Sequence, residues 1–165
     1  MTLGEEEIIS LLNQAKYLFL RHISEPEENS LRVVVEEAIA DHTETVSNPD
    51  PASPLAEIRK GASPIKATEG CRTFELQWSR YVPYLVTEEG VGSGGSREDE
   101  VYTGNLLWVY TKSHFLDHLA RDTGGHFEPI LHYKLICQSH LIDVASYGPP
   151  EVRLLESSGA RPRPN

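Results

Sequence analysis

The sequence predicts an α+β fold in which an N-terminal helical hairpin packs on a curved antiparallel β-sheet of about four strands. Apolar residues recur at helical spacing over residues 4–42 and alternate at strand spacing from Cys71 onward. Because the helical segments come first and the strands follow, the order favours an antiparallel sheet over alternating βαβ units. We expect one domain over residues 1–156 and a disordered tail over residues 157–165.

The first predicted helix spans residues 4–23. Thr2 and Glu5 have capping-box spacing, and glutamates fill the first turn, where the helix dipole favours negative charge. An apolar stripe then runs from Ile8 to Ile23 at intervals of three and four residues.

A second helix is predicted from Leu31 to His42. Pro26 ends the first helix, and Val34, Val35 and Ile39 then continue the helical spacing. A connection this short favours an antiparallel hairpin. The proline-rich residues 43–70 are expected to form a long connection with at most one helical turn.

Three long strands and a short one are predicted after Cys71. The first runs to Val86, with Pro83 at a bulge or a sheet edge, since proline donates no ladder hydrogen bond. A loop over residues 88–100 joins it to a second strand, Val101–Tyr110, so the two are expected to form a hairpin. The third strand spans residues 129–146, and Glu151–Leu155 can form a short fourth one.

A short helix is expected between the second and third long strands. Ser113 is its predicted N-cap, and Gly124 and Gly125 end it. The predicted core of the whole fold comprises Leu12, Phe19, Val35, Ile39, Leu76, Trp78, Leu106, Trp108, Leu135 and Cys137.

The charge of the chain narrows its partners. A formal net charge of −10 disfavours nucleic acid and anionic membranes, which both attract Lys and Arg, and it leaves a basic protein partner or a homodimer compatible. The N-terminal residues do not resemble a secretory leader, and no apolar run is long enough to span a membrane. Together with only two cysteines, these features predict a cytoplasmic protein.

Acidic residues concentrate in the first fifty positions, which hold 11 acidic and 3 basic side chains. The leading functional hypothesis is therefore a non-catalytic binding protein whose acidic helical face meets a basic protein partner. On the predicted second helix, Glu36 and Glu37 are the candidate partner-binding residues. The ordinary alternative for each acidic cluster is a solvated helix face.

A competing hypothesis places a ligand site on the third long strand. His132, Lys134, Gln138 and His140 occupy even positions there, so an unbroken strand would put them on one face. They could bind an anion or perform acid–base chemistry in a pocket, as an enzyme or a small-ligand binder. The alternative is a solvated face with Tyr133 and Leu135 turned to the core.

No cofactor motif and no structural metal site are expected. His114 and His118 are four residues apart, which is metal-ligand spacing, but a site would need further ligands such as Asp122 or His126. Asp143 lies three residues after His140, on the opposite face of a regular strand, so a direct hydrogen bond between these two is not expected.

Overall fold

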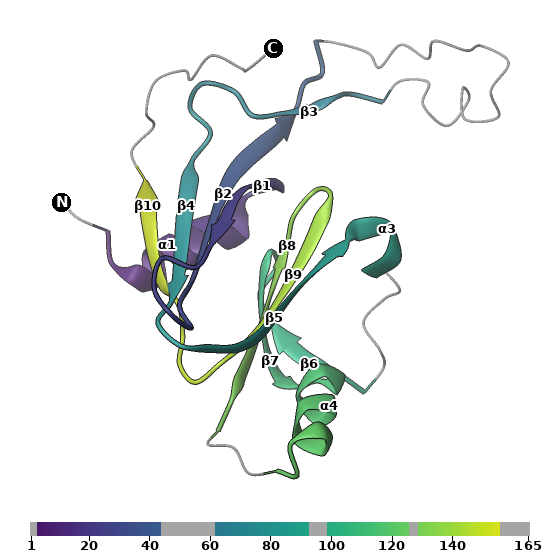
Figure 1. Cartoon of the computed structure of the whole chain (residues 1–165). Coiled ribbons are helices and arrows are strands. Elements are labelled where there is room, and N and C mark those ends of the chain that lie inside the picture. Colours follow the sequence, from purple (N-terminus) through teal and green to yellow (C-terminus); the bar gives the residue numbers. More distant parts are fainter. Residues whose placement is uncertain (1–2, 44–61, 93–98, 126–128, 156–165) are drawn as a thin grey trace, which may run out of the picture.

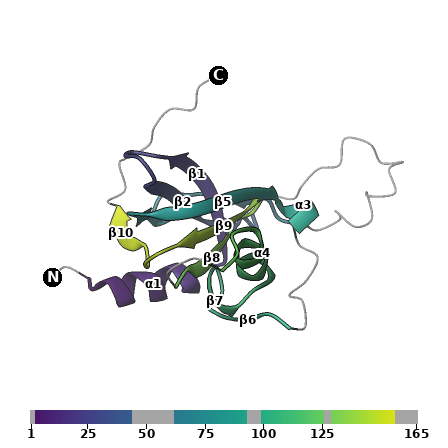
Figure 2. The same ribbon diagram turned by 60° about the horizontal axis from the view of Figure 1, so that its bottom comes forward.

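The computed structural model describes residues 3–43, 62–92, 99–125 and 129–155. Over these residues the chain forms two antiparallel β-sheets that pack face to face, and helix α1 (Glu5–Gln14) lies at one end against a strand of each (Figures 1 and 2). The predicted class, mixed α+β with antiparallel sheets, is confirmed. Within the described residues, no helix is both long and apolar enough to cross a membrane.

The first sheet has the strand order β1-β2-β4-β10, and β3 pairs with β2 beside β4. Its strands are β1 (Tyr17–Ser24), β2 (Leu31–Ala40), β3 (Ile65–Lys66), β4 (Thr73–Trp78) and β10 (Glu151–Leu155). The second sheet has the order β5-β9-β8-β7-β6. It contains β5 (Tyr81–Glu88), β6 (Val101–Thr103), β7 (Leu107–Lys112), β8 (Leu131–Ile136) and β9 (His140–Ser146). The other described helices are α3 (Glu89–Gly92) and α4 (His114–Asp122).

The prediction of an N-terminal helical hairpin is wrong for the second helix and for the C-terminal part of the first. α1 stops at Gln14, and the rest of the segment forms the antiparallel β1–β2 hairpin. The β-branched run Val33–Val35 satisfies a helical spacing and a strand equally well, and β-branched residues favour strands. The deciding contacts are distant in sequence: β2 pairs with β4, and Leu31, Val33 and Val35 all point into the core.

All three predicted long strands are divided by a turn, and the second of them, Val101–Tyr110, is split into the paired strands β6 and β7. Residues 71–86 change sheets between β4 and β5, and residues 129–146 form the β8–β9 hairpin. The predicted hairpin between the first two long strands is also wrong, because β5 pairs with β9 and β6 pairs with β7. Three finer predictions are confirmed: β10 spans Glu151–Leu155, Ser113 caps α4, and Pro83 lies on an edge strand within a register shift.

Several predictions fall outside the described residues. They are the Thr2 cap, the helical turn within residues 44–61, residues 93–98 of the 88–100 loop, His126 and the tail over residues 157–165.

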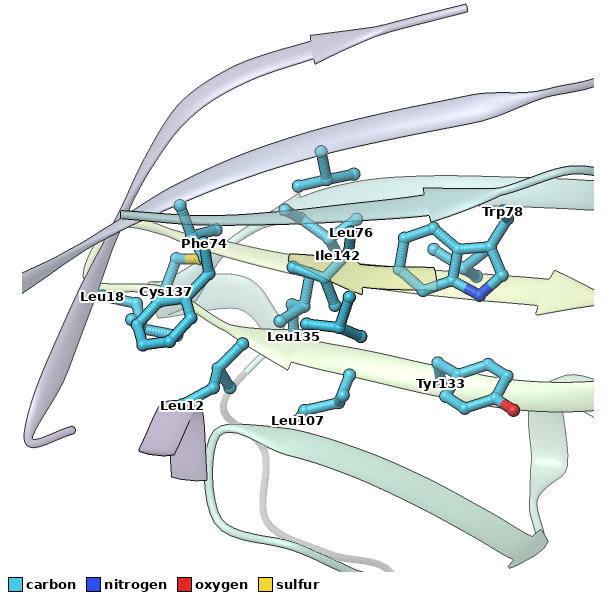
Figure 3. Close-up of a cluster of buried hydrophobic side chains, with 14 of the residues drawn as sticks. Leu12, Leu18, Phe74, Leu76, Trp78, Leu107, Tyr133, Leu135, Cys137 and Ile142 are labelled. Carbon is cyan, nitrogen blue, oxygen red and sulfur yellow. The ribbon is translucent and has the colours of Figure 1, made fainter. Parts of the chain in front are cut away.

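The core lies between the two sheets (Figure 3). Phe74, Leu76 and Trp78 of β4 face Tyr133 and Leu135 of β8. Each fully buried apolar side chain contributes about 1.5–3 kcal/mol relative to an exposed one. Six predicted core residues are buried, namely Leu12, Val35, Leu76, Trp78, Leu135 and Cys137.

The other predicted core positions differ in exposure. Leu106 packs partly buried against the core, and Phe19 is half-buried. Ile39 is 44% exposed, because it lies near the end of β2 beyond the sheet-to-sheet contact. Trp108 is half-buried on the outer face of the second sheet, where its ring stacks on Tyr102. The inward partners in β7 are Leu107 and Val109 instead.

A single amide fastens α1 to the β6–β7 turn. The Oδ1 of Asn13 accepts hydrogen bonds from the backbone N–H groups of Asn105, Leu106 and Leu107 at 2.8, 2.9 and 3.0 Å. Asn105 Nδ2 donates in return to the Asn13 carbonyl at 3.2 Å. Three consecutive N–H groups that converge on one oxygen resemble the concave backbone sites that bind anions.

Gly104 makes this close approach sterically feasible. Its φ of 99° lies in the left-handed region, and a Cβ built there would stand 2.0 Å from the Leu107 carbonyl oxygen. Only glycine therefore fits this turn.

Replacing Asn13 with alanine should destabilise the protein. Three backbone donors would lose their acceptor, which costs about 1–3 kcal/mol in the free energy of unfolding. Asn13→Asp is the matched control, because it keeps an oxygen at the same position, and we expect it to lose less than half as much. Urea unfolding at pH 7 measures both. Equal losses in the two variants would show that the acceptor is not what matters.

Candidate functional site

Two predicted site residues, His132 and Lys134, meet Asp143 on the outer face of the second sheet. In the pairing of β8 with β9, Lys134 lies opposite Asp143 and His132 lies opposite Ala145. Alternation along each strand turns these side chains away from the core, which takes Tyr133, Leu135, Ile142 and Val144.

His132 connects a serine to a carboxylate. Its Nδ1 lies 2.8 Å from Ser113 Oγ, and its Nε2 lies 2.9 Å from Asp143 Oδ1. An ionised carboxylate only accepts, so Nε2–H donates to Asp143, and in the neutral ring Nδ1 accepts from the Ser113 hydroxyl. The Lys134 ammonium lies 3.2 Å from the same Asp143 oxygen. We call Ser113, His132, Asp143 and Lys134 the polar chain.

Helix α4 begins on this polar chain. Ser113 Oγ accepts a hydrogen bond from Leu116 N–H at 3.1 Å, which makes it the N-cap. The Tyr110 ring stacks on the imidazole at 4.2 Å, and the Phe115 ring lies 5.0 Å from it. Burial raises the pKa of the Tyr110 hydroxyl, and the negative charges of Glu100 and Asp143 raise it further.

The order serine, imidazole, carboxylate matches the proton-transfer chain of serine hydrolases, in which imidazole removes the proton of the nucleophile. Here the ring nitrogens are exchanged, and Ser113 and His132 are each only 2% exposed. A substrate therefore has no route to the hydroxyl in this conformation. A described cavity of about 240 Å³ lies elsewhere, lined by Asn29, Arg80, Tyr81, Val82 and Tyr147. The geometry of the polar chain supports a structural task, which is to fix α4 on the sheet.

Gln138 and His140 do not join His132 and Lys134. The predicted cluster required an unbroken strand, whereas the β8–β9 turn lies between Ile136 and His140. Backbone N–H of Gln138 donates to the Leu18 carbonyl at 2.7 Å, and the His140 side chain is exposed at the turn. Asp143 bonds to His132 rather than to His140. No sequence feature links Ser113 to His132, because only the β7–β8–β9 register brings them together.

Glu36 and Glu37 lie on β2, not on a helix, and each forms an ion pair with an arginine. Arg21 Nε donates to Glu36 at 2.5 Å, and Arg72 forms two bonds of 2.8 and 2.9 Å with Glu37. The Arg72 side-chain hydrogen bond is the main reason that the pKa of the Glu37 carboxyl is lowered. Glu36 and the Arg32–Glu75 pair therefore lie on the outer face of the first sheet, whereas Glu37 alternates to the face that carries Leu18 and Val35.

Each of the candidate metal histidines lies within ion-pair distance of one carboxylate. His114 Nε2 lies 2.8 Å from Asp99, and His118 Nε2 lies 3.3 Å from Asp122. Glu100 accepts from the His114 backbone N–H at 2.9 Å, which further caps α4. In the part of the chain that the structure describes, no group of three or more His, Cys, Asp or Glu residues is placed to hold a metal ion.

Comparison with known proteins gives no relative: no protein family model, curated protein or solved structure matches this chain. The interpretation of its sites accordingly depends on their own geometry.

Acid should weaken the Glu37–Arg72 pair. The folded-state pKa of Glu37 is below its ordinary value of 4.5, so the stabilisation is fully present above that pH and falls as the pH drops through the lowered pKa. Glu37→Gln should lower the free energy of unfolding by about 1 kcal/mol at pH 7. The difference in this free energy between the variant and wild type should shrink below pH 4.5. Urea unfolding between pH 3 and pH 7 measures this, with the exposed Glu69→Gln as control. A difference that does not change with pH would contradict the assignment.

Removing the His132 imidazole should lower the free energy of unfolding, because the polar chain fixes α4 on the sheet. His132→Ala leaves the buried Asp143 and Ser113 without their shared partner, and we expect a loss of about 3 kcal/mol in the free energy of unfolding. The exposed His140→Ala should change it by less than about 0.5 kcal/mol. Chemical denaturation compares the two. A His132 variant as stable as the His140 variant would mean that the polar chain does not support the fold.

Proposed function

We propose that this protein is a non-catalytic binding protein whose acidic surface meets a basic protein partner. The observation that carries the proposal is the loop between β1 and β2, where Glu27 and Glu28 are exposed. Neither carboxylate has a basic partner among the described residues. A net charge of −10 adds a long-range field that attracts a basic protein and speeds its association.

The loop presents its carboxylates from a fixed backbone. Buried Ser30 accepts from Glu27 N–H at 2.9 Å and donates its hydroxyl to the Glu27 carbonyl at 2.9 Å. Asn29 takes a φ of 58°, a left-handed conformation that asparagine tolerates better than most residues. A loop ordered in advance loses less conformational entropy when a partner binds.

Other acidic residues contribute less to this surface because they already have donors. Glu36 and Glu37 remain candidate partner-binding residues, but a partner's lysine would compete there with Arg21 and Arg72. Reversing their charge would also disturb the sheet, which makes them poor probes of binding.

The same charge argument bears on the expected partners, and the low cysteine content bears on the expected location. We propose a cytoplasmic protein that binds neither nucleic acid nor membrane, since both present negative charge. A homodimer is a variant of the same class, which light scattering at several concentrations would detect.

The second candidate function is a small-ligand binder or an enzyme that uses His132 and Lys134, without His140, which the β8–β9 turn places apart from them. The specific observation in its favour is the bond between Ser113 Oγ and His132. The burial of both groups weighs against it. A fluorophosphonate probe, which esterifies an activated serine, distinguishes the two classes.

Charge reversal in the β1–β2 loop should weaken partner binding. The double variant Glu27→Lys, Glu28→Lys should capture a basic partner from lysate at least about 10-fold less than wild type, because each close ion pair contributes up to about 1 kcal/mol. Glu69→Lys, Asp122→Lys is the control, since it makes the same change in net charge at two exposed positions elsewhere. Quantitative mass spectrometry at low and high salt provides the readout, and capture should fall as salt rises.

Equal capture by wild type and the loop variant would remove the basis of this proposal. Equal loss in both double variants would mean that only the net charge matters, without a defined surface.

A further inference from the structure

The cavity that Arg80 lines adjoins the β1–β2 loop. This loop carries Glu27 and Glu28, and we call it the acidic loop. The cavity is an open surface depression of about 240 Å³, and its lining comes from Asn29 of the β1–β2 loop, Arg80 of the turn before β5, Tyr81 and Val82 at the start of β5, and Tyr147 after β9. Backbone bonds hold these three segments together: Tyr81 N–H donates to the Asn29 carbonyl at 2.9 Å, and Tyr147 N–H donates to the Arg80 carbonyl at 3.2 Å. The walls of the cavity are therefore fixed.

Arg80 differs from the arginines of the first sheet. Arg21, Arg32, Arg72 and Arg153 each pair with a glutamate. The exposed Arg80 has no carboxylate within ion-pair distance among the described residues, and its guanidinium lies 4.2 Å from the centre of the Tyr147 ring. Stacking on an aromatic face leaves the N–H groups at the edge of the guanidinium free for a planar acceptor.

We propose that the Arg80 cavity binds the C-terminal carboxylate of a basic polypeptide partner. The inference rests on the proposed function and names the part of the partner that is recognised. A carboxylate matches the planar guanidinium edge in a bidentate manner.

The charges around the cavity select this ligand over a free anion. The Tyr81 hydroxyl donates a hydrogen bond to the Glu25 carboxylate at 2.7 Å, and Glu27 and Glu28 follow in the same loop. Their negative charge repels a small, doubly charged anion such as phosphate. A carboxylate on a basic segment brings its own lysines or arginines, which these glutamates attract.

The strand that follows Arg80 explains why the carboxylate should be terminal. β5 is an edge strand with β9 on one side only, and Leu85 and Val86 are 51% and 39% exposed. Pro83 interrupts this edge near Arg80, whereas the regular part of β5 from Tyr84 to Glu88 is a template for the addition of an extended segment. A segment that runs antiparallel to β5 would have its C-terminus beside Arg80. Its terminal carboxylate could then contact the Arg80 guanidinium.

Two synthetic peptides test the proposal. Both are N-acetylated Lys-Val-Lys-Val-Lys-Val, one with a free C-terminal carboxylate and one amidated. NMR titrations follow the Arg80 Nε–H and the Tyr147 amide. In wild type, the free acid should bind about 10-fold more tightly than the amide, as expected for one charge-assisted bidentate contact. Arg80→Gln should remove this ratio, and Arg80→Lys should keep only part of it.

The controls separate the carboxylate contact from general electrostatics. Arg121→Gln makes the same change in net charge and should leave the ratio between the peptides unchanged. Thermal unfolding of each variant confirms that it is folded. Inorganic phosphate at matched ionic strength should not shift the Arg80 resonance.

Several results would overturn the inference: equal affinity for acid and amide, an unchanged ratio in Arg80→Gln, no binding of either peptide, or phosphate binding as tight as that of the free acid. Failure of the proposed function looks different. If Glu27→Lys, Glu28→Lys weakens both peptides equally while amidation has no effect, the acidic surface stands and the carboxylate site falls. If that variant has no effect while the acid-to-amide ratio persists, the carboxylate site stands and the acidic surface falls.

Discussion

The contact between the inner faces of the two sheets fixes everything else in this protein. Only Ser79 and Arg80 separate β4 in one sheet from β5 in the other. Trp78 immediately before this crossing lies 5.9 Å from the Tyr133 ring of the opposite sheet. The indole Nε1 of Trp78 is buried without a hydrogen-bond partner among the described residues, so the apolar contacts of this ring outweigh the cost of a desolvated donor. The same crossing sets Arg80 beside Tyr147 and the acidic loop beside Tyr81.

Charged groups on the two outer faces have different consequences. On the first sheet, the Arg21–Glu36 pair is partly exposed, so water and salt weaken it. On the second sheet, Asp143 and His132 are almost fully buried and satisfy one another. Buried pairs add little net stability but are costly to break. A slip of one residue between β8 and β9 would move Asp143 away from its partners, so the polar chain helps to specify the register.

Local patterns in the sequence were sufficient for some elements and insufficient for others. The alternation of Phe74, Leu76 and Trp78, the Ser113 cap and the Pro83 edge each depend on neighbouring residues, and the sequence predicts all three. The β1–β2 hairpin depends on pairing with β4, some forty residues away, which a helical spacing conceals. Gln138 and Ser139 form a turn without the glycine or proline that usually indicates one. The candidate sites were harder still: Ser113 meets His132 only through strand register, and nothing near Arg80 in the sequence indicates that Tyr147 will lie beneath it.

The two ends of the described chain meet, and this has a consequence for how the protein folds. Glu5 of α1 accepts from the Val152 backbone N–H at 3.1 Å, and β10 completes the first sheet beside β4. Partners so distant in sequence close large loops, and proteins dominated by such contacts fold slowly. On a ribosome, the first sheet stays open along β4 until residues 151–155 have emerged. During that interval the edge of β4, beside Phe74, Leu76 and Trp78, is unpaired and is the site that a chaperone would shield.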